Sequence, residues 1–170
     1  SWQDGAVVDV HAAMLQATAA ELRRIGVLLV AVECPPPPEL IDALAKLGWV
    51  RGQSAEFDCA SGVARLHEMP SIAASLVARK PDVIVSALLP GVRALRDATP
   101  TIPIVAMGVA DPVGQGLIRS LVRPGGNLTG LVSVMLEVEE KRIELLKLAL
   151  PKATRLAAVY REGEPGYYAA

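Results

Sequence analysis

Short apolar runs alternate with amphipathic segments along most of the chain. Residues 24–32 (RIGVLLVAV) form a nearly continuous apolar run that ends just before a group of prolines, and this is typical of a strand buried on both faces. Residues 39–48 then place Leu40, Leu44 and Leu47 on one helical face. The pattern therefore predicts a strand followed by a helix at the start of the folded region.

The same alternation continues to the end of the chain. Further strands are expected at 55–58, 82–86, 104–107, 128–131 and 155–160, and helices at 70–80, 90–98, 113–122 and 136–150. Strands separated by helix-length segments predict βαβ units in a parallel sheet, and right-handed crossovers place the helices on both faces. The predicted fold class is α/β, a parallel sheet with helices on both faces.

Length limits the number of domains. The chain has 170 residues, which suffices for one core but not for two domains of ~100–150 residues each. We expect residues 1–23 to form an N-terminal helical extension and residues 24–132 to form one ligand-binding lobe. Residues 133–170 are expected to be a crossover and the start of an incomplete second lobe.

Charge and hydropathy exclude some classes of partner. A net charge of -1 supplies no field for nucleic acid or an anionic membrane surface. The apolar runs fall well below the ~20 residues that cross a bilayer. Residues 1–21 lack the basic start and continuous apolar middle of a secretory signal, so we expect the signal peptide of an exported protein to be absent from this chain.

The residues most often used in catalysis and metal binding are sparse. Cys34 and Cys59 have neither Cys-x-x-Cys nor Cys/His ligand spacing, so no metal site is expected. Cys34 follows the first strand, where a nucleophile would need a neighbouring base that the sequence does not identify, so a packing or disulfide role is favoured. His11 and His67 are expected to be surface or helix-end residues.

In an open parallel sheet a ligand sits beyond the carboxyl ends of the strands. The sequence has neither Gly-x-Gly-x-x-Gly after the first strand nor Gly-x-x-x-x-Gly-Lys-Ser/Thr anywhere, so nucleotide binding is disfavoured and no cofactor is expected. Asp111 precedes Pro112 at the start of the expected helix at 113–122. It is predicted to cap that helix, and it lies where it can also accept a hydrogen bond from an ammonium or hydroxyl group of a ligand.

Several motifs, taken in order, resemble the ABC transporter substrate-binding proteins of the tryptophan/tyrosine-type family. The resemblance covers residues 24–162 and is carried by segments 24–28 (RIGVL), 47–53 (LGWVRGQ), 80–85 (KPDVIV), 111–118 (DPVGQGLI), 123–131 (RPGGNLTGL) and 141–147 (KRIELLK). It implies a type I periplasmic-binding-protein lobe of flavodoxin-like topology. It also implies a small solute, an amino acid or related small acid, that is handed to an ABC permease in the inner membrane.

The resemblance further implies which residues contact the solute. Carried over to this chain, they are Glu33, Ala87, Leu88, Leu89, Gly108, Asp111 and Ser133. Where the family usually has a hydroxyl-bearing stretch after the third strand, this chain has Ala87-Leu88-Leu89-Pro90. Binding of a ligand carboxylate at the start of the following helix is therefore less favoured than in the family. An apolar group of the ligand is as well suited to this position as a carboxylate.

The leading hypothesis is a non-enzymatic solute receptor, periplasmic or lipid-anchored on the extracytoplasmic side. The alternatives are a ligand-sensing domain of a signalling protein and, less favoured, a flavodoxin-like enzyme that would need a cofactor. The resemblance implies a second lobe of which we expect only the start here. The first helix and strand of that lobe are then expected to be exposed and to bind a partner, such as a second copy in a homodimer.

Overall fold

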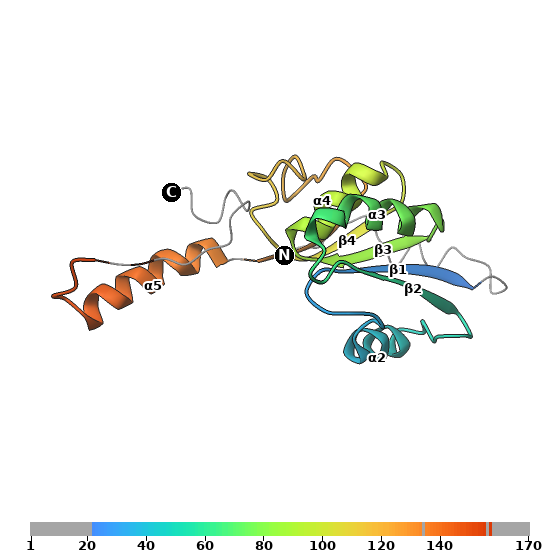
Figure 1. Ribbon diagram of the computed structural model, residues 1–170, viewed down its shortest axis with the longest axis horizontal. Coiled ribbons are helices and arrows are strands. Elements are labelled where there is room, and N and C mark those ends of the chain that lie inside the picture. The colour runs from blue at the N-terminus through green and yellow to red at the C-terminus, as the bar shows by residue number, and fades with distance from the viewer. Residues whose placement is uncertain (1–21, 134, 156, 158–170) are drawn as a thin grey trace.

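The computed structural model describes residues 22–133, 135–155 and 157, and Figure 1 shows their arrangement. Five strands form one fully parallel sheet in the order β2-β1-β3-β4-β5. The strands are β1 (Arg23–Leu29), β2 (Ala55–Ser61), β3 (Val83–Ala87), β4 (Ile104–Ala110) and β5 (Leu128–Ser133). Because β2 and β3 flank β1 on opposite sides, the strand order reverses between β1 and β3.

Helices cover both faces of the sheet. One face carries α2 (Pro38–Lys46), and the other carries α3 (Met69–Ala78) and α4 (Leu89–Ala98), with a short 3-10 turn, η1 (Leu66–Glu68), before α3 (Figure 1). The predicted fold class, an α/β parallel sheet with helices on both faces, is confirmed.

Strand β1 shows why its sequence is apolar without alternation. Ile25 and Val27 pack on the α2 side of the sheet, whereas Leu28 and Val30 pack against α3 and α4. Successive side chains of a strand point to opposite faces, so a central strand with helices on both faces needs apolar residues at every position. The strand ends at Leu29, which pairs with Ser61 of β2, and residues 30–32 form the start of a loop.

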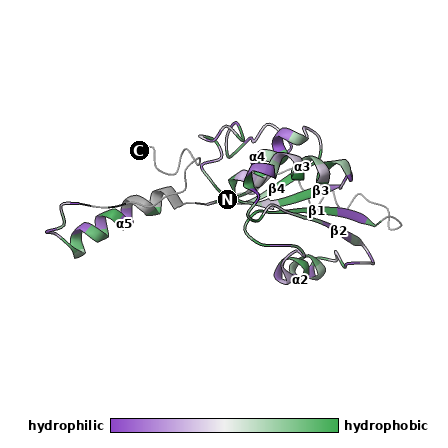
Figure 2. Ribbon diagram, viewed as in Figure 1, coloured by the Kyte–Doolittle hydropathy of each residue, from purple (hydrophilic) through white to green (hydrophobic). Residues whose placement is uncertain are grey.

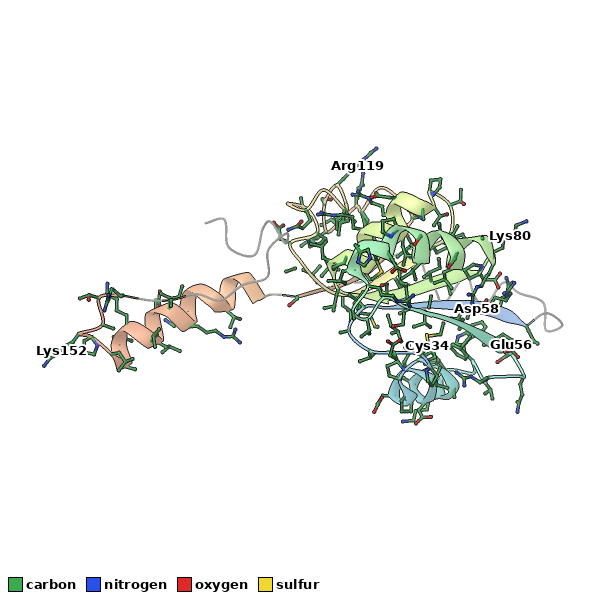
Figure 3. The ribbon with its side chains drawn as sticks, viewed as in Figure 1. Cys34, Glu56, Asp58, Lys80, Arg119 and Lys152 are labelled. Atoms are coloured by element: carbon green, nitrogen blue, oxygen red, sulfur yellow. A yellow bond between two sulfur atoms is a disulfide. The ribbon has the colours of Figure 1, made fainter. Side chains whose placement is uncertain are left out.

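Ion pairs gather at the opposite, amino-terminal end of the sheet. Arg23 Nη1 lies 2.8 Å from Asp82 Oδ1, and Arg24 Nη2 lies 2.6 Å from Asp58 Oδ2. Figure 3 shows Asp58 in this region. These side chains are partly exposed, so each pair contributes at most about 1 kcal/mol, and the network joins β1, β2 and β3 away from the carboxyl ends.

The prediction of a helix at 113–122 was wrong. The structure forms a run of turns there, in which the amides of Leu117 and Ile118 both donate to the carbonyl of Pro112. Gly116 has a φ of +65°, a conformation that a right-handed helix does not use. Two glycines within three residues, Gly114 and Gly116, also lower helix propensity by about 1 kcal/mol each, so the chain turns instead of propagating a helix.

Helix α5 (Met135–Ala149) follows β5 and extends away from the sheet and its covering helices (Figure 1). Figure 2 shows hydrophobic positions in the described part of α5. Their large apolar side chains are exposed, from 40% for Leu146 to 76% for Leu148. None of the helices within the described residues is long and apolar enough to span a membrane. The strand expected at 155–160 lies outside the described residues except for Arg155 and Ala157, and the extension expected at 1–23 does so except for Leu22 and Arg23.

Candidate functional site at the carboxyl ends of the strands

The carboxyl ends of β3, β4 and β5 lie side by side. Ala87 of β3 is in register with Met107 of β4, and Ala110 of β4 is in register with Ser133 of β5. Neighbouring strands are ~4.8 Å apart, and β4 continues for three residues beyond Met107, so Asp111 follows its strand farther along the strand direction than Leu88 does. The structure thus places the predicted residues of these three strands at the carboxyl side of the sheet, with Glu33 in the loop that follows β1.

Leu88 is the exposed residue of the segment after β3. It has a φ of 68° and ψ of 149°, and its side chain is 42% exposed. Ala87 is half-buried, whereas Leu89 is only 9% exposed and packs into the core with α3 and α4. Of the three residues expected here, Leu88 is the one that presents an apolar side chain at the edge.

Helix α4 begins directly after Leu88, so its amino terminus lies at the same edge. Among the described residues no side chain caps this end, and Pro90 in the first turn has no amide hydrogen. The amides of the first turn and the helix dipole favour a negatively charged group there. The edge therefore combines an apolar side chain at Leu88 with an electropositive helix end.

Asp111 follows β4 and closes a single turn. Its Oδ1 accepts a hydrogen bond of 2.9 Å from the amide of Gly114, and its carbonyl accepts one of 3.0 Å from the amide of Gln115. The capping hydrogen bond expected from the sequence is present, although no helix follows it. Asp111 is exposed, and a carboxylate has acceptor capacity for donors beyond one amide. The residue can therefore serve a turn and a ligand at once.

A β-bulge in β4 sets where Asp111 emerges. The pairing of β4 with β5 shifts between Met107 and Val109, and Gly108 at this point has a φ of +71°. Glycine adopts this conformation without the steric cost that a Cβ would bring. Bulges bend a strand and change the direction of the residues after it. We interpret the role of Gly108 as steering the β4 end, with its backbone exposed at the edge.

Two arginines of α4 hold the turn after β4. Arg93 Nη2 donates to Gln115 Oε1 over 2.8 Å, and Arg96 Nη1 donates to the carbonyl of Gly116 over 2.8 Å. Side chains of one helix thus tie down the turn that Asp111 opens. Since Leu88 is the residue directly before α4, the positions of Leu88 and Asp111 both depend on this helix.

The loop after β1 is joined to β2 by a disulfide. Cys34 and Cys59 are bonded, with Cα atoms 6.0 Å apart, which identifies the disulfide among the roles left open by the sequence. The hydroxyl of Ser61 donates to the carbonyl of Val32 over 3.0 Å. Glu33 lies between these two attachments and is exposed.

Sequence reasoning missed two exposed apolar residues at this edge. Val32 precedes Glu33 and is 50% exposed, and Val113 follows Pro112 and is 41% exposed. Val32 was expected to lie inside the first strand and Val113 inside a helix, so neither stood out. A large apolar residue within two positions of a polar candidate residue, Glu33 for Val32 and Asp111 for Val113, is the sequence feature that could have identified them.

Few groups in the described part of the chain suggest catalysis. The His67 side chain is 80% exposed on η1, beside Glu68. No group of three or more metal-binding side chains occurs among residues 22–133, 135–155 and 157. The chemistry available at the carboxyl edge is hydrogen bonding, charge and apolar contact.

Comparisons with known proteins identify relatives of this chain. A sequence profile of the ABC transporter substrate binding protein family matches residues 39–167. The "Tyrosine-binding protein" of Clostridioides difficile is 36% identical over 124 residues, which are 73% of this chain and 35% of that protein.

Two solved structures are also similar. A conserved domain protein from Vibrio cholerae has a TM-score of 0.67 and 34% identity, and the match covers 78% of this chain and 45% of that one. An ABC domain from Streptococcus pneumoniae in complex with L-Trp has a TM-score of 0.58 and 29% identity, and the match covers 66% of this chain and 39% of that one. The chain thus spans between about a third and a half of the length of these relatives.

Proposed function

The chain belongs to the family of ABC transporter substrate-binding proteins, and on that premise we propose that it is the solute-binding component of an ABC import system. The solute is an amino acid or related small acid that binds at the carboxyl edge of the sheet. The observation that carries this proposal is the placement of Leu88 and Asp111 on neighbouring strand ends. No catalytic step is part of the proposed function.

The groups at the edge match the parts of an amino acid. The Asp111 carboxylate can accept hydrogen bonds from an ammonium group, and the amino terminus of α4 favours a carboxylate. Leu88, Val32 and Val113 supply exposed apolar surface on the segments that follow β3, β1 and β4. We therefore propose a solute with a large apolar or aromatic side chain, in keeping with relatives named for tyrosine and solved with L-Trp.

The proposed location is extracytoplasmic, either periplasmic or lipid-anchored. Structural disulfides persist in oxidising compartments, and Cys34 and Cys59 form one. The proposed protein partner is the permease of the same import system, which receives the solute in the inner membrane.

We further propose that residues 24–132 form the first ligand-binding lobe and that α5 belongs to a second. Ile143, Leu145 and Leu148 of α5 are each more than half exposed, and an apolar surface of this kind favours association. In a solution of the 170-residue chain without other proteins, we propose that a second copy covers these apolar side chains of α5. Light scattering after size exclusion should give the mass of a dimer at high concentration, and a monomer at every concentration would contradict this part.

A thermal-shift panel tests the solute assignment. Tyrosine, tryptophan, phenylalanine and leucine are compared with glutamate and glucose on the 170-residue chain. A ligand present at about 1,000 times its Kd stabilises a protein by about 4 kcal/mol, so concentrations up to the solubility limit of each solute are used. Stabilisation by the apolar and aromatic amino acids alone is expected. An unchanged melting temperature with all six compounds would overturn the proposed function.

A further inference from the structure

The loop between β1 and α2 is attached to β2 at two neighbouring points. Ser61 holds the carbonyl of Val32 through its hydroxyl, 3.0 Å away, and Cys59 holds Cys34 through the disulfide. Cys59 and Ser61 are two residues apart on one strand, so their side chains lie on the same face of the sheet. The two attachments therefore pull the loop onto one patch of β2.

Glu33 lies between these two attachments. Its neighbour on one side is fixed by Ser61 and its neighbour on the other side by Cys59. Figure 3 shows Cys34 on the α2 side of the sheet. Pro36, shortly after, is buried, whereas Glu33 and Cys34 are exposed. The backbone on both sides of Glu33 is thus restrained while its side chain remains available to a ligand.

We propose that Cys34, Cys59 and Ser61 act as a clamp that positions Glu33 for solute binding. The inference rests on the proposed function, because it assigns Glu33 a place in the solute site. A restrained loop binds more tightly than a mobile one because less conformational freedom is lost on binding. The clamp residues act through Glu33 and need not touch the solute.

The clamp can be opened by reduction. An external dithiol such as dithiothreitol gives two electrons and two protons to the Cys34–Cys59 bond, which yields two thiols and the cyclic disulfide of the reagent. The exposure of Cys34 gives the reagent access. Of the two attachments, only the hydrogen bond from Ser61 then remains, and the position of Glu33 becomes variable.

Solute affinity of the oxidised and reduced chain tests the clamp, with L-tyrosine and L-tryptophan as probes. If the loop adopts its solute-binding conformation about a tenth of the time after reduction, the apparent Kd for the solute rises about tenfold. The same rise is expected in the C34S/C59S variant without reductant, and a smaller one in S61A. Reoxidation should restore the affinity of the wild type but leave the double variant unchanged.

Two controls separate positioning from general stability. D82N weakens the network at the amino end of the sheet, where Asp82 accepts from the amide of Arg24 over 2.7 Å, and it should lower the melting temperature without changing Kd. The 15N order parameters of the amides of Ala31, Val32 and Glu33 should fall on reduction, whether or not a solute binds. An unchanged Kd on reduction overturns the proposal, as do unchanged order parameters of these amides. Absence of solute binding to the oxidised chain, with lower order parameters in the reduced loop, would instead count against the proposed function.

Discussion

Leu88 and Asp111 both have left-handed backbone conformations at the carboxyl ends of adjacent strands, with φ of 68° and 40°. Such conformations cost about 1–3 kcal/mol in a residue with a side chain and often occur at ligand sites. Ala64 and Lys80 also have positive φ, so the conformation alone does not identify a site. Its occurrence at the ends of two neighbouring strands, one of them directly before α4, is what distinguishes this edge.

Asp111 is expected to serve the turn and the solute separately. In D111N the side-chain oxygen still accepts from Gly114, so the melting temperature should hardly change, whereas D111A should lose about 1 kcal/mol of stability. Both variants lose a charged acceptor for an ammonium group, which is worth about 1.5–3 kcal/mol, so affinity should fall by about 10- to 150-fold in each. Calorimetric titration with L-tyrosine measures this. Full affinity in D111N would show that Asp111 serves the turn alone.

Leu88 is expected to matter for binding more than for stability. Glycine adopts its backbone conformation freely, and the side chain is 42% exposed, so L88G should unfold at the same urea concentration or a higher one. Loss of an apolar contact of about 1–2 kcal/mol should weaken tryptophan binding by roughly 5- to 30-fold. L47G is the matched control, since Leu47 is 63% exposed at the end of α2. Equal affinity losses in both variants would remove the case for Leu88.

The disulfide should contribute measurably to global stability. Cys34 and Cys59 are 25 residues apart, and cross-linking a loop of that length stabilises a protein by about 3 kcal/mol in the chain-entropy description. The C34S/C59S variant should therefore unfold at a lower urea concentration than the wild type. Dithiothreitol should shift the wild type to the same midpoint and leave the variant unmoved. If the reductant does not shift the wild type, the two cysteines are not paired in solution.

Close packing of α4 on the sheet predicts a site where one methyl group is harmful. A Cβ at Gly91 would lie 2.6 Å from Ser86 Oγ and 2.9 Å from Val30 Cγ2. Overpacking of this kind costs about 1–3 kcal/mol, which exceeds the helix-propensity gain of about 1 kcal/mol, so G91A should be destabilised in urea unfolding. Gly126 has no atom within 4 Å of such a Cβ, and G126A should be neutral. Two equally stable variants would show that α4 does not pack this closely.

Most of the fold follows from patterns that the sequence displays. Every strand of the sheet overlaps a predicted one. The central strands carry short apolar runs, as in Val83–Ala87, whereas the strands at 55–58 and 128–131 were predicted from the alternation of strands and helices. Strand ends were less predictable because pairing decides them. Strand β2 continues three residues beyond its predicted end, to Ser61, since β1 offers a partner as far as Leu29. The helix expected at 113–122 does not form because the turn-favouring glycines in this segment outweigh its apolar pattern.

The position of the candidate site stays a prediction. The carboxyl ends of parallel strands are a general place for ligands, and the candidate residues at this edge were carried over from the family resemblance. The left-handed conformation of Leu88 and the two attachments around Glu33 depend on tertiary contacts that no local pattern reports. Similarly, the pairing of Cys34 with Cys59 depends on the loop folding back onto β2.

The most direct test of solute binding at the carboxyl edge is an amide chemical-shift titration of the 15N-labelled, oxidised 170-residue chain with L-tyrosine and L-tryptophan. Saturable shifts are expected at Glu33, Leu88, Asp111 and Ser133, and none at Arg24 or Asp82 at the amino end of the sheet. Absence of saturable shifts, or shifts confined to residues away from the carboxyl edge, would contradict the assignment.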